Sequence, residues 1–188
     1  MRLFLSINFS NRNKKLIQNK VNLLKTKIDE KVKWVKKENW HITVKFLGEV
    51  KSDRLAKVKN KINEIKSYES FYFQISNVSA FPDLNYPKIV YMGINRGKEK
   101  LIEINKELEE KLAELNFEKE KRSFTPHLTI GRSKDYTNIK KLSNQLKNII
   151  DESHFVNIYA KANKISLMKS ELKESGPNYK EIFSKNIK

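Results

Sequence analysis

Strict alternation of apolar and polar residues predicts two short strands that lie far apart in the chain. The first covers residues 40–47 and stops at Gly48, and the second covers residues 127–130 directly after Pro126. A period of two residues is typical of a strand with one buried face and one open face. Proline is tolerated at the start of a strand, where its missing N–H is not needed.

The alternation also assigns the side chains of these strands to faces. The polar face is expected to carry His41, Thr43 and Lys45 in the first strand, and His127 and Thr129 in the second. The core is expected to receive Ile42, Val44, Phe46, Leu128 and Ile130. Gly131 can bend the second strand, which would direct Arg132 toward the same site.

Other periodic patterns predict the remaining elements. Apolar stripes with helical spacing predict four helices, over residues 11–28, 53–65, 98–115 and 137–150, with Ser52 and Asp53 able to cap the second. Further strands are expected over residues 2–9, 32–35, 71–75, 88–94, 155–160, 164–169 and 179–184, with 155–160 and 164–169 paired to each other. Residues 81–87 have the composition of a turn-rich loop.

Each of the two alternating strands leads into a helix after a short loop. This repetition predicts a diverged internal duplication of class α+β, with two lobes that are related by a pseudo-two-fold axis and each give one histidine strand to a central cleft. The length of 188 residues suits one two-lobed domain over residues 1–188. Clefts between such lobes are common ligand sites.

Composition narrows the setting in which the protein works. The chain has no cysteine, which excludes disulfides and thiolate chemistry and favours the cytoplasm. Its first residues are too short and too alternating for a signal peptide, and no apolar run has the length of a membrane span. The net charge of +17 favours a polyanionic partner such as RNA. A lysine-rich composition adapted to a hot habitat explains the charge equally well.

The histidines carry the candidate chemistry. The chain has 3 histidines, and two of them, His41 and His127, are followed two positions later by threonine. Chance would give such a pair roughly two times in a thousand, which makes the repeat informative. Two imidazoles can act together as general acid and general base near neutral pH. His154 has no such threonine and is expected to be an ordinary surface residue.

Around these motifs the sequence resembles the 2H phosphoesterase superfamily. It is most similar to the RNA 2′,3′-cyclic phosphodiesterases that are also called 2′-5′ RNA ligases. The resemblance covers nearly the whole chain and includes residues 2–4, 34–35, 38–48, 80–82, 87, 91–93, 124–132 and 176–179. Gly131 stands where many relatives carry alanine.

The resemblance implies a bilobal fold of two pseudo-symmetric antiparallel sheets flanked by helices, with the two histidines facing each other across a groove. It also implies hydrolysis of a 2′,3′-cyclic phosphate at an RNA 3′ end to a 2′-phosphate. It implies that His41 is the proton donor and His127 the proton acceptor, an assignment that the nearly symmetric motifs leave open. Thr43 and Thr129 would bind the nonbridging oxygens. The remaining candidates are Lys45 and Arg132 as electrostatic helpers, and Phe81, Tyr86 and Tyr91 as base-stacking residues.

No metal or cofactor is expected, because no histidine has a second histidine or a carboxylate at ligand spacing. The expected partner is RNA with a cyclic phosphate end, with tRNA halves as one example, bound by a monomer away from membranes. Three alternatives stay open from the sequence. They are 2′-5′ ligation of tRNA halves, action on a small cyclic nucleotide or a 2′-5′ oligoadenylate, and an RNA-end-binding module without turnover.

Overall fold

The computed structural model describes residues 1–29, 31–134, 138–151, 156–174 and 176–187. Its helices are α1 (Asn11–Lys27), α2 (Leu55–Glu64), α3 (Lys98–Ala113) and α4 (Ile139–Asp151), with short 3-10 turns η1 (Lys37–Asn39) and η2 (Ser52–Arg54). Its strands are β1 (Arg2–Asn8), β2 (Val32–Trp34), β3 (His41–Glu49), β4 (Phe71–Phe81), β5 (Ile89–Ile94), β6 (His127–Ser133), β7 (Ile158–Ala162), β8 (Lys164–Lys173) and β9 (Gly176–Asn186). The predicted α+β class is confirmed.

The strands form two antiparallel halves that meet at one point. The strand order is β7-β4-β5-β6-β3-β1-β8-β9, with β2 added beside β6. Between the halves, β6 and β3 share one registered residue pair, Ile42 with Leu128. We call the half from β7 to β6 the β6 lobe and the half from β3 to β9 the β3 lobe. The two predicted sheets are thus joined edge to edge at their centre.

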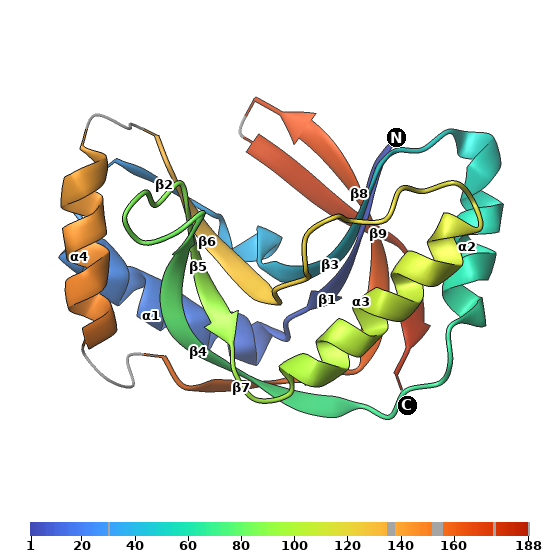
Figure 1. Ribbon diagram of the computed structural model, residues 1–188, viewed down its shortest axis with the longest axis horizontal. Coiled ribbons are helices and arrows are strands. Elements are labelled where there is room, and N and C mark those ends of the chain that lie inside the picture. Colours follow the sequence, from blue (N-terminus) through green and yellow to red (C-terminus); the bar gives the residue numbers. More distant parts are fainter. Residues whose placement is uncertain (30, 135–137, 152–155, 175, 188) are drawn as a thin grey trace.

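Helices cover each lobe on its own side of the molecule (Figure 1). In the β6 lobe, α1 packs against β7 and α4 against β4. In the β3 lobe, α3 packs against β3, and α2 packs against both α3 and β9. The apolar stripes that predicted these helices are buried, as for Ile17, Val21 and Leu24 of α1.

The connectivity repeats between the lobes. The order β1–α1–β3–α2 in the first part of the chain matches β5–α3–β6–α4 in the second. About the junction of β3 and β6, β1 takes the place of β5, β8 that of β4, and β9 that of β7. This arrangement agrees with the predicted duplication, and it puts the two histidine strands beside the pseudo-two-fold axis.

One strand pairing was predicted wrongly. β7 pairs with β4, whereas β8 pairs with β1 and β9, so β7 and β8 are not partners. Only Asn163 separates β7 from β8, and a hairpin needs a loop of at least about two residues. The chain instead passes here from the outer edge of the β6 lobe into the β3 lobe.

Matching β-bulges interrupt the two histidine strands. In β3, Thr43 pairs with Ser6 and Lys45 with Leu5, which leaves Val44 as an extra residue. In β6 the register with β5 shifts in the same way and leaves Ile130 as the extra residue. A bulge changes which face the following side chains take, so the alternation expected from the sequence ends at each bulge.

Candidate active site

The two histidines lie on one face of the sheet where the lobes meet. His41 and His127 each precede a residue of the Ile42–Leu128 pair, and because the strands are antiparallel the two histidines lie diagonally across it. Side chains in that relation are separated by about 7–8 Å. Positive charge on His127 lowers the pKa of His41, as expected for imidazoles within electrostatic reach.

Backbone carbonyls fix both rings in the same way. The Nδ1 atom of His41 lies 2.7 Å from the carbonyl oxygen of Asn39, and that of His127 lies 2.7 Å from the carbonyl oxygen of Thr125. A carbonyl can only accept a hydrogen bond, so Nδ1 must carry the proton in each ring. Each Nε2 atom is then left with the lone pair of a neutral imidazole.

A threonine stands beside each histidine. The Thr43 hydroxyl lies 2.9 Å from the Nε2 atom of His41, so it donates to the neutral ring and can accept from the protonated ring. His127 and Thr129 are both half-buried, and the residues that alternate with them, Leu128 and Ile130, are buried. The predicted sharing of one face by each histidine and its threonine is confirmed.

Aromatic rings enclose His41. The ring centroid of Phe4 lies 4.8 Å from that of His41, and the ring of Tyr179 meets the imidazole edge-on at 5.3 Å. Phe4 and Tyr179 also contact each other at 5.0 Å. The packing holds the imidazole between β1 and β9 and removes much of its hydration.

A second aromatic pair encloses His127. Phe81 and Tyr91 stack on each other at 4.3 Å, and they contact the imidazole at 4.9 Å and 5.3 Å. Of the three predicted base-stacking residues, these two therefore lie beside a histidine. Tyr86 instead lies under the ammonium group of Lys88, at 4.9 Å from its ring centroid.

Burial makes both imidazoles poor proton carriers in the free protein. The pKa of His41 falls to about 4, chiefly because burial removes hydration. The hydrogen bond to the Asn39 carbonyl opposes this fall, and the charges of Lys14 and His127 add to it. Burial and then the charge of Arg132 lower the pKa of His127, against the carbonyl of Thr125. Near neutral pH both rings are therefore uncharged in the free protein.

The charge of Arg132 reaches a titratable group in each lobe. Its charge lowers the pKa of His127 in one lobe and that of Tyr179 in the other, although burial raises the Tyr179 pKa overall. Among the described residues no carboxylate forms an ion pair with Arg132. The predicted approach of Arg132 to the histidines is supported, and its guanidinium group is available for an anion.

Lys45 does not lie where the sequence placed it. The bulge at Val44 turns this side chain into the protein, where it is 2% exposed. Its ammonium group lies 2.6 Å from a carboxylate oxygen of Glu109 and 3.0 Å from the carbonyl oxygen of Glu118. Glu109 also accepts from the backbone N–H of Glu120. The prediction that Lys45 shares the histidine face is wrong.

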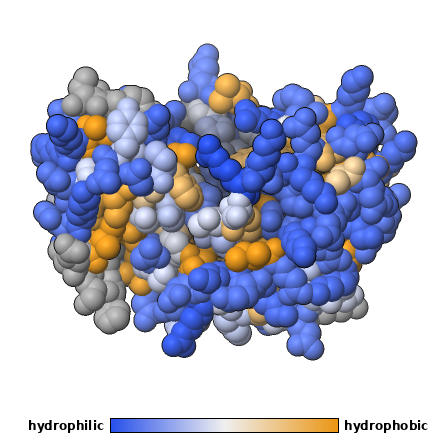
Figure 2. Space-filling model, viewed as in Figure 1, coloured by the Kyte–Doolittle hydropathy of each residue, from blue (hydrophilic) through white to orange (hydrophobic). Residues whose placement is uncertain are grey.

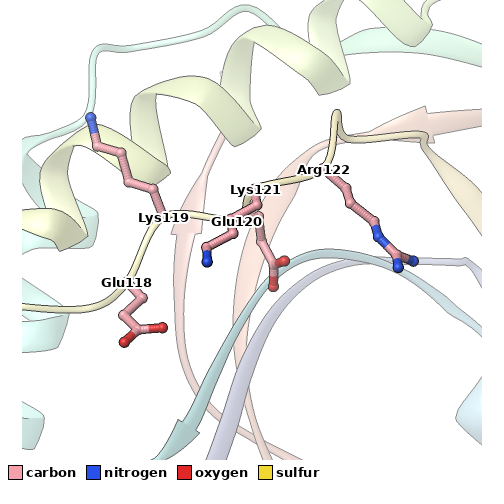
Figure 3. A pocket seen from close by; sticks show the side chains of 5 residues that line it. All are labelled: Glu118, Lys119, Glu120, Lys121 and Arg122. Carbon is pink, nitrogen blue, oxygen red and sulfur yellow. The ribbon is translucent and has the colours of Figure 1, made fainter.

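The ion pair anchors the loop that precedes β6. Figure 3 shows residues 118–122 of this loop, with Lys119 pointing away from the other four side chains. They line an open hollow of about 390 Å³ that contains neither histidine. A second hollow, of about 620 Å³, lies beside Gln74 and Asn157 and also contains no histidine. The candidate site is thus defined by its chemistry and not by the size of a hollow.

Sequence reasoning missed several residues that shape the site. The carbonyls of Asn39 and Thr125 orient the rings, but a backbone atom leaves no trace in residue type. The Tyr179 ring contacts His41 from β9, and the charge of Lys14 acts on His41 from α1. Both effects depend on tertiary packing. His154, the third histidine, lies outside the described residues.

Neither a metal site nor a membrane-spanning helix is found in the described parts of the chain. There, no three histidine, aspartate or glutamate side chains come close enough together to hold a metal ion. None of the helices described is both long enough and apolar enough to cross a membrane. The face drawn in Figure 2 is mostly hydrophilic, with hydrophobic residues confined to separate patches.

Two imidazoles share one face of the sheet, each has a threonine two residues on, and the charge of Arg132 reaches one of them. This combination is suited to acid–base chemistry. The chain matches the LigT-like phosphoesterase family over residues 14–91 and 93–179. It therefore belongs to that family, and the resemblance inferred from the motifs is confirmed.

Individual relatives agree with this assignment. The chain is 38% identical over 184 residues to a Methanocaldococcus jannaschii protein named RNA 2′,3′-cyclic phosphodiesterase, covering 97% of this chain and 98% of that protein. It is 32% identical over 164 residues to an Aquifex aeolicus protein of the same name, covering 83% of each.

Solved structures share the fold. A Thermus thermophilus protein superposes with a TM-score of 0.76 at 19% identity, over 100% of this chain and 98% of that one. Escherichia coli LigT complexed with 3′-AMP gives a TM-score of 0.74 at 19% identity, over 99% of this chain and 97% of that one. At these identities the likeness concerns the fold alone.

Proposed function

We propose that the protein hydrolyses the 2′,3′-cyclic phosphate at the 3′ end of RNA and leaves a 2′-phosphate. The names of the relatives at 38% and 32% identity support this substrate. The observation that carries the proposal is the matched pair of imidazoles beside the Ile42–Leu128 junction. Each has its Nδ1 proton held by a carbonyl and its Nε2 atom available for proton transfer.

In the proposed reaction, water attacks phosphorus in line with the 3′ oxygen. The new bond joins the water oxygen to phosphorus, and the bond from phosphorus to the 3′ oxygen breaks. His127 accepts a proton from the water, and His41 gives a proton to the departing 3′ oxygen. The product carries a 2′-phosphate and a free 3′-hydroxyl group.

Thr43, Thr129 and Arg132 bind the nonbridging oxygens in this proposal. Negative charge grows on these oxygens in the transition state, so donors aimed at them lower the barrier. Hydrogen bonds to a charged oxygen are about twice as strong as neutral ones. The Thr43 hydroxyl, which serves His41 in the free protein, would turn to the phosphate when substrate binds.

The proton on His41 must arrive with the substrate. With a pKa of about 4 this imidazole is uncharged in the free protein at neutral pH. An anionic phosphate next to Nε2 favours the charged imidazolium and raises the pKa of the ring. Binding of the phosphate would therefore create the general acid that the reaction needs.

We further infer that the two lobes act as one domain, since their buried residues form one continuous core. We expect a cytoplasmic monomer that needs no cofactor and takes RNA fragments such as tRNA halves. The charge of +17 suits such a polyanion.

The direct test is incubation with an RNA oligonucleotide that ends in a 2′,3′-cyclic phosphate, in excess EDTA. The expected product ends in a 2′-phosphate, identified by chromatography against 2′- and 3′-phosphate standards. A 3′-phosphate product would contradict the proposed direction of opening. Complete loss of turnover in EDTA, restored by a divalent ion, would contradict the metal-free mechanism. Adding an RNA with a 5′-hydroxyl end to the same mixture measures ligation.

A further inference from the structure

The first strand of the chain carries an exposed arginine, Arg2, on the histidine face. Successive side chains of a strand point to opposite faces, so Arg2 shares its face with Phe4, two residues further on. Phe4 lies on the histidine face, because its ring centroid is 4.8 Å from that of His41. Phe46, which pairs with Phe4, is 59% exposed, although the sequence pattern placed it in the core.

Two further hydrogen-bond donors continue the row of residues that Arg2 begins. Arg2 pairs with Ser170 of β8, and Ser170 pairs with Tyr179 of β9. Directly paired residues share one face of a sheet, so the three side chains follow one another across three strands (Figure 1). The Tyr179 ring extends from this row toward the candidate site, since it meets the His41 imidazole edge-on at 5.3 Å. We call Arg2, Ser170 and Tyr179 the donor row.

The donor row has no acceptor for its hydrogen bonds. Among the residues that the structure describes, none accepts a hydrogen bond from these three side chains or forms an ion pair with Arg2. The nearest carboxylate in the register is that of Glu49, and it binds the N-terminal ammonium group at 3.1 Å. Burial raises the pKa of Tyr179, and the charges of Arg132 and Arg2 oppose that rise. Both guanidinium groups therefore act on this phenol.

The chemistry of the donor row suits a phosphate group. A guanidinium group can bind two phosphate oxygens at once, and serine and tyrosine hydroxyls are common phosphate contacts in nucleic-acid complexes. The row is separate from the place between the two imidazoles, because Phe4 lies between Arg2 and His41 and a further 7 Å of strand, about two residues, leads from Phe4 to Arg2. A phosphate on the donor row is therefore a second one, displaced along the substrate from the phosphate that reacts.

We propose that Arg2, Ser170 and Tyr179 bind a backbone phosphate of the RNA on the 5′ side of the cyclic phosphate. The inference rests on the proposed function and adds a second anion site to it. Arg132 holds the phosphate that reacts, and Arg2 holds one that does not. Contacts with the backbone carry no base preference, but they favour an RNA end over a free cyclic mononucleotide. The donor row thus selects against the small cyclic nucleotides that the sequence left open as substrates.

The test uses two natural substrates and two modified ones. The natural substrates are adenosine 2′,3′-cyclic phosphate and a triadenylate that ends in the same cyclic phosphate. In each modified triadenylate, one of the two phosphodiesters is replaced by an uncharged methylphosphonate.

Arg2→Gln should raise KM for the triadenylate about ten- to a hundredfold with little change in kcat. It should leave the mononucleotide unaffected, because that substrate has no second phosphate. One of the two methylphosphonates should raise the wild-type KM by a similar factor and abolish the effect of Arg2→Gln, which identifies the phosphate that is bound. Ser170→Ala and Tyr179→Phe each remove one neutral donor and should raise KM for the triadenylate about two- to tenfold.

Two further variants serve as comparisons. Arg132→Ala should impair the mononucleotide and the triadenylate alike, because both contain the reacting phosphate. Lys57→Gln removes one positive charge from the exposed surface of α2, which covers the other side of the β3 lobe, and should change neither KM. Since Arg2 and Lys57 are both exposed, their variants should unfold at nearly the wild-type temperature.

Three results would overturn the inference. Arg2→Gln could leave KM for the triadenylate unchanged, it could raise KM for the mononucleotide equally, or its effect could persist with both methylphosphonate substrates. Failure of the wild-type protein to open any cyclic phosphate would instead refute the proposed function, so the two failures are distinguishable.

Discussion

The two histidine strands are alike up to the bulge and differ after it. In both, a carbonyl two residues before the histidine holds Nδ1, a threonine follows, and one extra residue forms the bulge. The next position is Lys45 in β3 and Gly131 in β6. Lys45 enters a buried ion pair, whereas the space beside Gly131 is filled by Val32 and Trp34 of β2.

This comparison shows which features a duplicated site has retained. An alanine at Gly131 would place its Cβ atom 2.6 Å from a methyl group of Val32, so the Val32 side chain would have to shift to admit it. In β3 the equivalent residue, Lys45, instead reaches Glu109 and the carbonyl of Glu118, and so holds the loop that precedes β6. The arrangement of histidine, carbonyl partner, threonine and bulge is therefore common to both lobes, and the packing after the bulge is not.

Removing either imidazole should have the largest effect. His41→Ala and His127→Ala should each lower kcat/KM by about 10²–10⁴-fold, because each removes one proton-transfer step. His154→Ala is the control and should retain wild-type turnover. Near-normal activity of either active-site variant would exclude that residue from the acid–base pair.

A sulfur-substituted substrate sharpens the same comparison. When the 3′ oxygen is replaced by sulfur, the leaving thiolate needs no proton from a general acid, since a thiol is far more acidic than an alcohol. The His41→Ala variant should then recover most of its activity, whereas His127→Ala should not. Recovery of the His127 variant alone would reverse the proposed roles of the two lobes.

The alternation of polar and apolar residues predicted both histidine strands and the faces of the residues up to the threonines. It failed for Lys45 and Phe46 because the bulge at Val44 is set by pairing with β1, about forty residues earlier, and no local pattern records it. The partner of β7 was missed for the same reason, because its pairing with β4 is a tertiary contact that no local pattern records. Residue types thus located the two candidate histidines and their threonines, while tertiary pairing decided which charged and aromatic side chains lie on the same face.

Replacing Lys45 tests whether its role is structural. Lys45→Met leaves the Glu109 carboxylate buried without its cation, which should lower the free energy of unfolding by about 3–5 kcal/mol. The double variant Lys45→Met/Glu109→Leu should regain most of that stability, because the uncompensated charge is gone. Urea denaturation measures both changes. If Lys45→Met had wild-type stability and a raised KM, the result would instead support the role in substrate binding that the sequence predicted for Lys45.

The smallest expected effect is a lobe-specific change in pH dependence. Turnover requires one proton on the imidazole pair, so kcat/KM should be bell-shaped, with its maximum between the two pKa values of the free protein. Burial lowers both below 6.5, that of His41 to about 4, which places the maximum on the acidic side. The profile of kcat should lie at higher pH, because bound phosphate raises the pKa of a neighbouring imidazole.

Lys14→Gln separates the contributions of the lobes to this profile. The charge of Lys14 lowers the pKa of His41, whereas Arg132 has that effect on His127. Removing the Lys14 charge should therefore raise the lower pKa and move the acidic limb of kcat/KM to higher pH by a fraction of a unit, while the basic limb stays in place. Lys15→Gln, on the same helix but with no such link to His41, is the matched control. If the acidic and basic limbs of the kcat/KM profile shifted equally, the titrations of the two imidazoles would be coupled, and neither pKa could be assigned to a single lobe.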